Sequence, residues 1–424
     1  MRWTRTAGRA LLAATVLLSG CASTGGDAAD GRSDSRRGPL TFATAGDLTS
    51  YLRPLLADWN RARPQERVTL VELPDSADES RAQMITELRS QAGRYDLLNI
   101  DVAWTSEFAA AGWIAPLERD RFPLKSFLPP VVGTATYAGK LYAVPYVTNA
   151  GMLYYRKDLL ELEGERPPHT WAELERQART IAPKHGLDGY AGQFLPYEGL
   201  TVNAAEMVYS AGGSILGEEG EQVTVDSDAA RTGIGLLTRG VRDGWIPRKA
   251  LTYKEEESRR AFQGGRLLFL RNWPYAFAGA AGKDSKVAGK FGVVPLPGNG
   301  GSGTSVLGGS NLAVGARTAH PASAKDLITY LTSEPVQRRV LTEGALPPVR
   351  ASLYRDAELV RRFPYLPALR SSVLTAAPRP KSPRYDQVSL TVQAVVQDAM
   401  AQRQGAEMAI RRLAAELSAI THPG

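Results

Sequence analysis

Two acidic side chains and one indole ring follow short apolar segments of this chain, at the points where predicted strands end. Asp47 and Asp101 follow two such segments in the first hundred residues, and Trp273 follows a later one. A carboxylate accepts several O–H hydrogen bonds, and an indole offers a flat apolar face. These residue types suit noncovalent recognition of a polar molecule. Both aspartates also suit the simpler role of capping a following helix, and Trp273 that of a core residue.

Residues for covalent or metal chemistry are scarce. Cys21 is the only cysteine, so the chain forms no internal disulfide. The histidines lie far apart and form no H-E-x-x-H pattern; they are His169, His185, His320 and His422. The sequence contains no nucleophile motif and no phosphate-binding glycine loop. We therefore expect no metal, no cofactor and no catalytic residue.

The first 21 residues have the layout of a secretory signal, because three arginines accompany a short apolar run that ends in Leu-Ser-Gly-Cys at 18–21. This ending resembles the lipobox of bacterial lipoproteins, in which the cysteine is lipidated and becomes the first residue. A buried free cysteine or an ordinary signal cleavage is the alternative. The run is shorter than the ~20 residues that span a bilayer. We expect export and lipid anchoring through Cys21 to the outer face of the cell membrane.

Length and charge limit the remaining choices. About 400 residues follow Cys21, whereas a single core rarely exceeds ~300 residues, so two domains are expected. Residues 22–38 are small and polar and predict a flexible spacer. The net charge of +7 is spread along the chain without a basic block, which argues against a nucleic-acid partner.

The elements that must position the candidate side chains alternate between strand and helix. Apolar strands are predicted at 40–44, 68–73 and 97–100, with amphipathic helices at 49–63 and 80–92 between them. This alternation favours a parallel sheet covered by helices. Ligands of such sheets bind at the carboxyl ends of the strands, where Asp47 and Asp101 are expected.

The rest of the chain has a mixed pattern. A hairpin is predicted at 136–146, a helix at 170–184 with Thr170 as its N-cap and Glu173 three residues on, and a glycine-rich crossing at 298–303. The last third reads as helical. A chain that crosses repeatedly between two lobes gives a hinge, and the cleft between the lobes is the expected binding site.

The sequence resembles the extracellular solute-binding proteins of bacterial ABC transporters, and among them the carbohydrate-binding group (family 1). The similarity covers nearly all of the chain after residue 39, and its last three stretches are nearest to the trehalose- and maltose-binding branch. The stretches are A-G-D-L-T-S-Y-L (45–52), R-Y-D-L-L-N-I-D-V-A-W-T-S-E-F-A-A-A-G-W-I-A-P-L (94–117), A-G-K-L-Y-A-V-P-Y-V-T-N-A-G-M-L-Y-Y-R-K-D-L-L (138–160), T-W-A-E-L (170–174), P-Y-E-G-L-T-V-N (196–203), F-L-R-N-W-P-Y-A (269–276), V-L-G-G-S-N-L-A-V (306–314) and R-P-K-S-P-R-Y-D-Q-V-S (379–389).

The resemblance implies an α/β, two-lobed periplasmic-binding-protein-like fold of type II, in which each lobe is a mixed, mainly parallel sheet flanked by helices. It places the signal at 1–20 and the lipidated Cys21 with its linker at 21–38. It divides the remainder into a first lobe of 39–148 with about 304–350, and a second lobe of 149–303 with about 351–424.

The resemblance also implies a set of ligand-binding residues in the cleft. For Asn149 a turn, for Glu198 a helix cap and for Arg379 a solvated basic turn remain alternatives, and only one of Tyr154 and Tyr155 can face the cleft. The set is Asp47, Asp101, Asn149, Tyr155, Glu198, Trp273, Gly309, Ser310 and Arg379.

Two positions depart from the family pattern. Relatives often have an acidic residue where this chain has Asn149, and many have Trp where it has Ser310. The first change removes a charge, and the second removes a stacking face. Both leave the identity of a bound sugar open.

The implied function is capture of a carbohydrate, such as trehalose, maltose or a related oligosaccharide, by a monomer that delivers it to the transmembrane permease subunits of an ABC importer. One alternative is a secreted carbohydrate-active enzyme, because Asp101 and Glu198 could form a carboxylate pair. Others are a lipoprotein that binds a non-sugar solute such as a glycerophosphodiester, or one that presents a surface to another protein.

Overall fold

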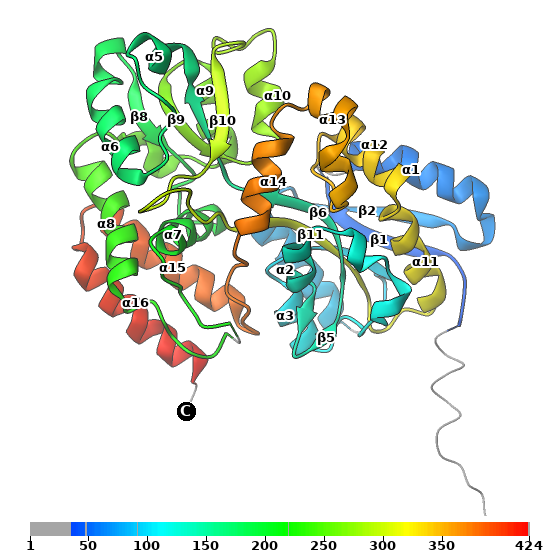
Figure 1. Cartoon of the computed structure of the whole chain (residues 1–424). Coiled ribbons are helices and arrows are strands. Elements are labelled where there is room, and N and C mark those ends of the chain that lie inside the picture. Colours follow the sequence, from blue (N-terminus) through cyan, green and yellow to red (C-terminus); the bar gives the residue numbers. More distant parts are fainter. Residues whose placement is uncertain (1–34, 47–48, 91, 219, 423–424) are drawn as a thin grey trace, which may run out of the picture.

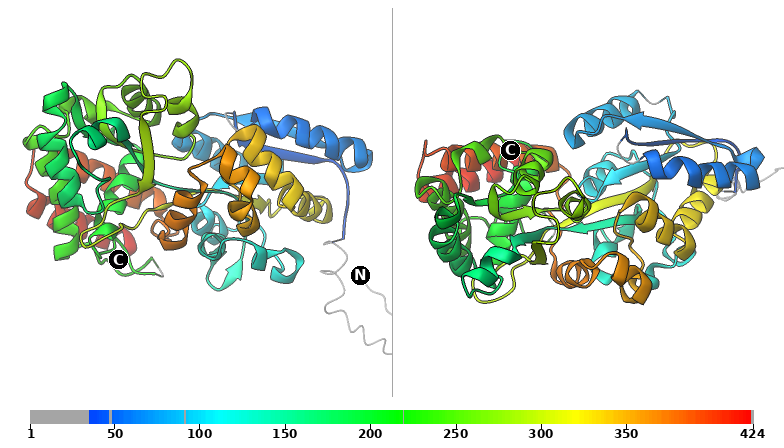
Figure 2. Two further views of the ribbon diagram at one scale, coloured as in Figure 1. Left: turned by 45° about the horizontal axis from the view of Figure 1, so that its top comes forward. Right: turned by 90° about the horizontal axis from the view of Figure 1, so that it is seen from above.

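The computed structural model describes residues 35–46, 49–90, 92–218 and 220–422. The signal at 1–20, Cys21, most of the linker and Asp47 lie outside these ranges. In the described part the chain forms two lobes side by side, each built on its own sheet (Figure 1). Figure 2 shows the same division from two further directions.

The first lobe contains a five-stranded sheet in the order β2-β1-β3-β11-β6. β1 pairs in parallel with β2 and β3, as the strand–helix alternation predicts, whereas β11 runs antiparallel to both of its neighbours. Its strands are β1 (Leu40–Ala45), β2 (Val68–Leu73), β3 (Leu97–Asp101), β6 (Val144–Ala150) and β11 (Leu307–Val314).

Helices pack against this sheet, and the longest of them does so through one apolar stripe. In α1 the stripe is Leu52, Leu55, Leu56 and Trp59, all buried. The helices of this lobe are α1 (Thr49–Ala62), α2 (Ala77–Arg89), α3 (Thr105–Ala110), α4 (Pro129–Thr134), α11 (Pro321–Leu331) and α12 (Glu334–Gly344), with 3₁₀ turns η2 (Pro64–Glu66), η3 (Arg119–Arg121) and η4 (Leu124–Ser126).

The second lobe contains a four-stranded sheet in the order β10-β7-β9-β8. Its strands are β7 (Met152–Arg156), β8 (Asp188–Ala191), β9 (Leu267–Asn272) and β10 (Phe291–Pro295). Its helices are α5 (Lys157–Leu162), α6 (Trp171–Thr180), α7 (Glu198–Ser210), α8 (Asp228–Arg242), α9 (Glu255–Gln263), α10 (Ala276–Ala281), α15 (Tyr385–Met400) and α16 (Ala406–Thr421), with η5 (Pro183–His185) and η6 (Arg248–Thr252).

Local signals in the sequence are confirmed where they are strong. Thr170 caps α6 as predicted, since its hydroxyl accepts from the Glu173 amide and the Glu173 carboxylate accepts from the Thr170 amide. The expected hairpin at 136–146 is shorter in the structure: β4 (Thr136–Tyr137) and β5 (Lys140–Leu141) form it, and β6 joins the first sheet.

Within the described residues, three segments of the chain pass between the lobes. The first is Gly151, between β6 and β7. The second is 304–306, because the glycine-rich run expected to cross instead folds back, with a bridge from Pro297 to Ser302. The third lies beside the second, where Val306 pairs in parallel with Ala377.

The stretch 351–375 sits between the lobes rather than wholly in the second, where the sequence placed it. Within it, η7 (Ala351–Arg355) and α13 (Ala357–Arg362) are tied to the first lobe, where Asp356 pairs with Arg338 of α12. α14 (Leu366–Thr375) packs against β6 and α4 on one side and β10 on the other (Figure 1, orange). The lobe boundary therefore falls within this stretch.

Candidate functional site

The strand ends that carry candidate residues in the first sheet lie opposite the end of β9 in the second sheet. Asp101 is the last residue of β3, and it pairs in register with Ser310 near the start of β11. Gly308 pairs with Asn149 close to the end of β6. Across from this edge, β9 ends at Asn272, so Trp273 follows directly. The carboxyl-end rule therefore brings candidates from distant parts of the sequence to one edge of the first sheet.

Arg379 joins the two lobes through carboxylates. Its Nη1 donates to Glu198 Oε1 of the second lobe at 2.6 Å, and its Nη2 donates to Asp101 Oδ1 of the first lobe. The Arg379 side chain is only 3% exposed. Burial acts to lower the pKa of Arg379, but the negative charge of Asp101, with that of Glu198, raises it by more. The guanidinium is thus held charged between the lobes, not in the solvated turn that was the alternative.

Glu198 is fully engaged within the protein. It begins α7, so it is the first residue of the helix rather than a cap before it. Tyr385 donates to the same Oε1 as Arg379, and Ser389 donates to Oε2 at 2.6 Å. Both partners lie on α15. The Glu198 carboxylate therefore fixes Arg379 and ties α7 to α15.

Asp101 keeps one oxygen for other use. Its Oδ1 accepts from Arg379 and from the Ala103 amide at 2.8 Å, which makes a local turn before α3. Its Oδ2 has no hydrogen bond to any residue that the structure describes. Burial raises the pKa of Asp101, and the Arg379 charge opposes that rise. Of the two carboxylates, Asp101 has the greater capacity for a further hydrogen bond.

Trp273 is fixed from several sides. The Arg271 guanidinium carbon lies 4.0 Å from the centre of the ring, and Tyr154 donates its hydroxyl to the Trp273 carbonyl at 2.8 Å. A Cβ built on Gly308 would lie 2.9 Å from the Trp273 ring, so the edge of the ring contacts β11 of the other lobe. Trp273 is only partly buried. Trp104 is different, because it is buried and stacks on Phe108 in the first-lobe core.

The remaining candidates divide into those near this group and those apart from it. Asn149 is partly exposed beside Gly308. Gly309 has a φ of +108°, and a Cβ there would lie 2.1 Å from the Val147 carbonyl, so strand packing explains this glycine. Tyr155 packs on Gly292 of β10 and has no printed contact with Arg379 or Trp273 within the described residues. Asp47 lies outside those residues.

Sequence reasoning missed several charged side chains at this edge. Arg81 of α2 pairs with Glu107 in its own lobe and with Asp386 of α15, 3.4 Å away in the other lobe. Partial loss of water contact raises the pKa of Asp78, and the negative charge of Glu198 raises it further. Acidic residues in the first turn of α2 were the available signal, but charged helix starts are common and carry no sign of a cleft.

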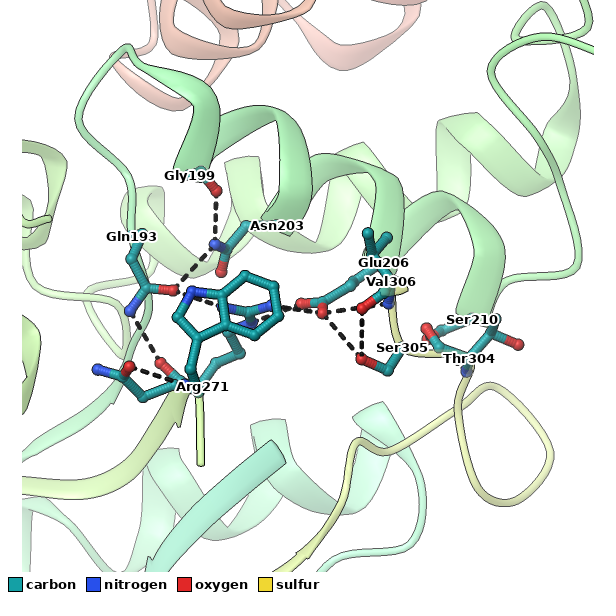
Figure 3. Close-up of polar contacts among 11 residues, drawn as sticks. Gln193, Gly199, Asn203, Glu206, Ser210, Arg271, Thr304, Ser305 and Val306 are labelled. Atoms are coloured by element: carbon teal, nitrogen blue, oxygen red, sulfur yellow. Dashed lines mark hydrogen bonds and ion pairs between the residues drawn. The ribbon is translucent and has the colours of Figure 1, made fainter. Parts of the chain in front are cut away.

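A second buried network was also missed, and Figure 3 shows it. Arg271 of β9 donates Nε and Nη2 to the two oxygens of Glu206 on α7, each at 2.6 Å. Both side chains are 1% exposed. Gln193 accepts from Arg271 Nη1 at 2.9 Å.

The described part of the chain lacks two features that would indicate other functions. No helix there is long and apolar enough to cross a membrane. No group of three or more His, Cys, Asp or Glu residues in the same ranges could hold a metal ion.

Comparison with known proteins shows the family to which this chain belongs. The pattern of the family described as "Bacterial extracellular solute-binding protein" matches residues 45–338. A Deinococcus radiodurans protein named "Probable ABC transporter-binding protein" is 34% identical over 369 residues, which cover 84% of this chain and 87% of that protein.

Solved structures give the same result and confirm the expected two-lobed fold. Maltose-bound MalE3 of T. maritima matches with a TM-score of 0.82 and 34% identity, over 90% of this chain and 99% of that one. A solute-binding protein of an ABC transporter from Thermotoga lettingae, bound with α-D-tagatose, matches with a TM-score of 0.79 and 25% identity, over 91% and 100% of the two chains.

Proposed function

Because the chain belongs to the family of bacterial extracellular solute-binding proteins, we propose that it is the substrate-binding component of an ABC importer that takes a sugar. The cargo is a disaccharide such as maltose or trehalose, or a related oligosaccharide. The protein captures it between the lobes, closes around it and delivers it to the permease. The lipid on Cys21 keeps it at the outer face of the cell membrane, and it acts as a monomer.

The observation that carries this proposal is the position of Arg379. A ligand favours a closed form only when it contacts both lobes. Arg379 already contacts Asp101 of the first lobe and Glu198 of the second. A molecule that hydrogen-bonds to Arg379 and Asp101 and lies on the Trp273 ring would therefore contact both lobes, which move relative to each other on closure.

The unpaired polar atoms suit sugar hydroxyls. Arg379 Nε and Ser310 Oγ are buried and have no hydrogen-bond partner among the described residues. A hydroxyl both donates and accepts, so it can serve a donor such as Nε and an acceptor such as Asp101 Oδ2. The Trp273 ring supplies an apolar face for the C–H side of a sugar ring. The MalE3 and T. lettingae structures, with their bound maltose and tagatose, support this class of cargo.

A thermal-shift screen of the purified protein tests the proposal. The panel contains trehalose, maltose, other gluco- and galacto-oligosaccharides, mannitol and glycerophosphodiesters. A ligand that binds only the native state raises Tm by an amount that grows with the logarithm of its concentration divided by its Kd. We expect a sugar to give the largest rise. A rise only with glycerophosphodiesters, or release of glucose from the disaccharides, would overturn the proposal.

A further inference from the structure

The buried Glu206–Arg271 pair lies where the three connections between the lobes meet. Ser305 donates its hydroxyl to Glu206 Oε1 at 3.1 Å, and the Val306 amide donates to the same oxygen at 3.3 Å. These two residues form the second connection. The third is tied to it, because the Ala377 amide donates to the Ser305 carbonyl at 2.9 Å.

The first connection also rests on this pair. A Cβ built on Gly151 would lie 2.3 Å from Glu206 Oε1 and 2.6 Å from Arg271 Nη2. The Gly151 backbone therefore runs directly against the two charged groups. One ion pair thus contacts two connections, and the third is hydrogen-bonded to Ser305, which the pair contacts.

Besides its ion pair with Glu206, Arg271 contacts an aromatic ring. Its guanidinium lies under the Trp273 ring at 4.0 Å, while Glu206 and Gln193 hold its nitrogens in place. A planar guanidinium that is fixed by a carboxylate makes a rigid backing for an indole ring. The ring edge meets Gly308 of the first lobe.

We infer that Arg271 is a positioning residue for ligand stacking: held by Glu206, it sets the orientation of the Trp273 ring relative to the segments on which the lobes turn. This inference rests on the proposed function for the role of the ring. A buried ion pair is weak evidence of stability, since an apolar pair of similar volume is often as stable. Its contacts with both the ring and the connections give a reason for its presence.

A double variant separates positioning from folding. Glu206→Leu with Arg271→Met keeps the volume and leaves no buried charge unpaired. The Val306 amide and Gln193 each lose a partner, so Tm of the free protein should fall while the protein stays folded. We expect the affinity for the sugar found in the thermal screen to fall about tenfold, the scale of a desolvated cation–π contact. Arg156→Met is the control, because Arg156 lies at the end of the neighbouring strand β7 and pairs with Asp158 of α5 rather than with Glu206.

A double-mutant cycle with Trp273→Ala shows whether Arg271 acts through the ring. If it does, the losses in affinity from the charge-pair variant and from Trp273→Ala are not additive. Additive losses, or wild-type affinity in the folded pair variant, would overturn the inference.

Two further measurements keep the inference testable on its own. Should the pair variant not fold, Arg271→Lys keeps the charge but lacks the planar group, and wild-type affinity there would contradict the inference. Should no sugar bind the wild type, the proposed function fails. A crystal structure of the ligand-free pair variant then decides the inference, since a displaced Trp273 ring supports it and an unmoved ring refutes it.

Discussion

At the scale of single residues, Arg379 lies between two carboxylates that belong to different lobes. Two carboxylates from different lobes share this guanidinium, and Glu198 is further saturated by two hydroxyl donors. Arg379 Nε has no hydrogen-bond partner among the described residues, and both hydrogen bonds that Asp101 accepts from them go to its Oδ1. The resemblance pointed to all three residues, but it could not show that contacts within the protein occupy the Glu198 carboxylate and leave Asp101 Oδ2 without a hydrogen bond to a described residue. That difference depends on contacts between residues that are 181 and 278 positions apart.

Arg379→Ala should weaken sugar binding ~10–100-fold, the range expected for lost hydrogen bonds to a charged group. Arg379→Lys should restore only part of the loss, because a single ammonium cannot reach both carboxylates as a fork does. Calorimetric titration measures both. Arg361→Ala, an exposed arginine of α13, is the matched control and should bind like the wild type.

At the scale of elements, a feature can be predicted from the sequence when the residues that form it lie close together along the chain. The capping box of α6 lies within four residues, and it was found. Helix α9 was not predicted, because its sequence EEESRRAFQ is mostly charged and buries only Ser258, Ala261 and Phe262. The Glu206–Arg271 pair joins positions 65 apart, and no local pattern reveals it.

Thr170→Ala removes the cap of α6 and should lower the free energy of unfolding by ~1 kcal/mol. Urea denaturation monitored by circular dichroism measures this loss. Thr180→Ala, at the exposed end of the same helix, changes no cap and serves as the control. An equal loss in both variants would argue against the capping box as the cause.

Glu165 provides a pH-dependent contribution near the start of the same helix. Hydrogen bonds from Arg176, and then from Gln177, lower the pKa of Glu165 from 4.5 to about 2. A lowered folded-state pKa gives stability that is present above the unfolded value and is lost as pH falls from 4.5 toward 2.

Glu165→Gln should therefore lower Tm by ~1–2 °C at pH 7, since the pair is partly exposed. The difference from the wild type should shrink as the pH is lowered from 5 to 3. Scanning calorimetry across this range measures it. A difference that does not change with pH would mean that the ion pair is not its source.

At the scale of the whole molecule, short segments of the chain join the two lobes. Gly151, the segment 304–306 and the stretch around Ala377 connect them, and α14 packs between them. The two-lobed α/β fold followed from the resemblance, and comparison with solved structures confirms it. The sequence could not locate the connections to the residue, because glycine-rich runs such as 298–303 predict turns and crossings equally.

Gly151→Ala tests how tightly the first connection is packed. The new methyl group would meet Glu206 and Arg271 at less than contact distance, so we expect a loss of ~1–3 kcal/mol in the free energy of unfolding. Gly133→Ala is the control, since a Cβ there has no neighbour within 4 Å and α4 should tolerate it. Chemical denaturation of both variants decides whether the crowding is real.

The most direct test of sugar capture between the lobes is a crystal structure of the protein with the sugar that raises its Tm most. The account predicts electron density for a sugar between the lobes, with a ring face on Trp273 and hydroxyls on Asp101 and Arg379. Density for the sugar at another surface, with the cleft side chains arranged as in the ligand-free protein, would contradict it.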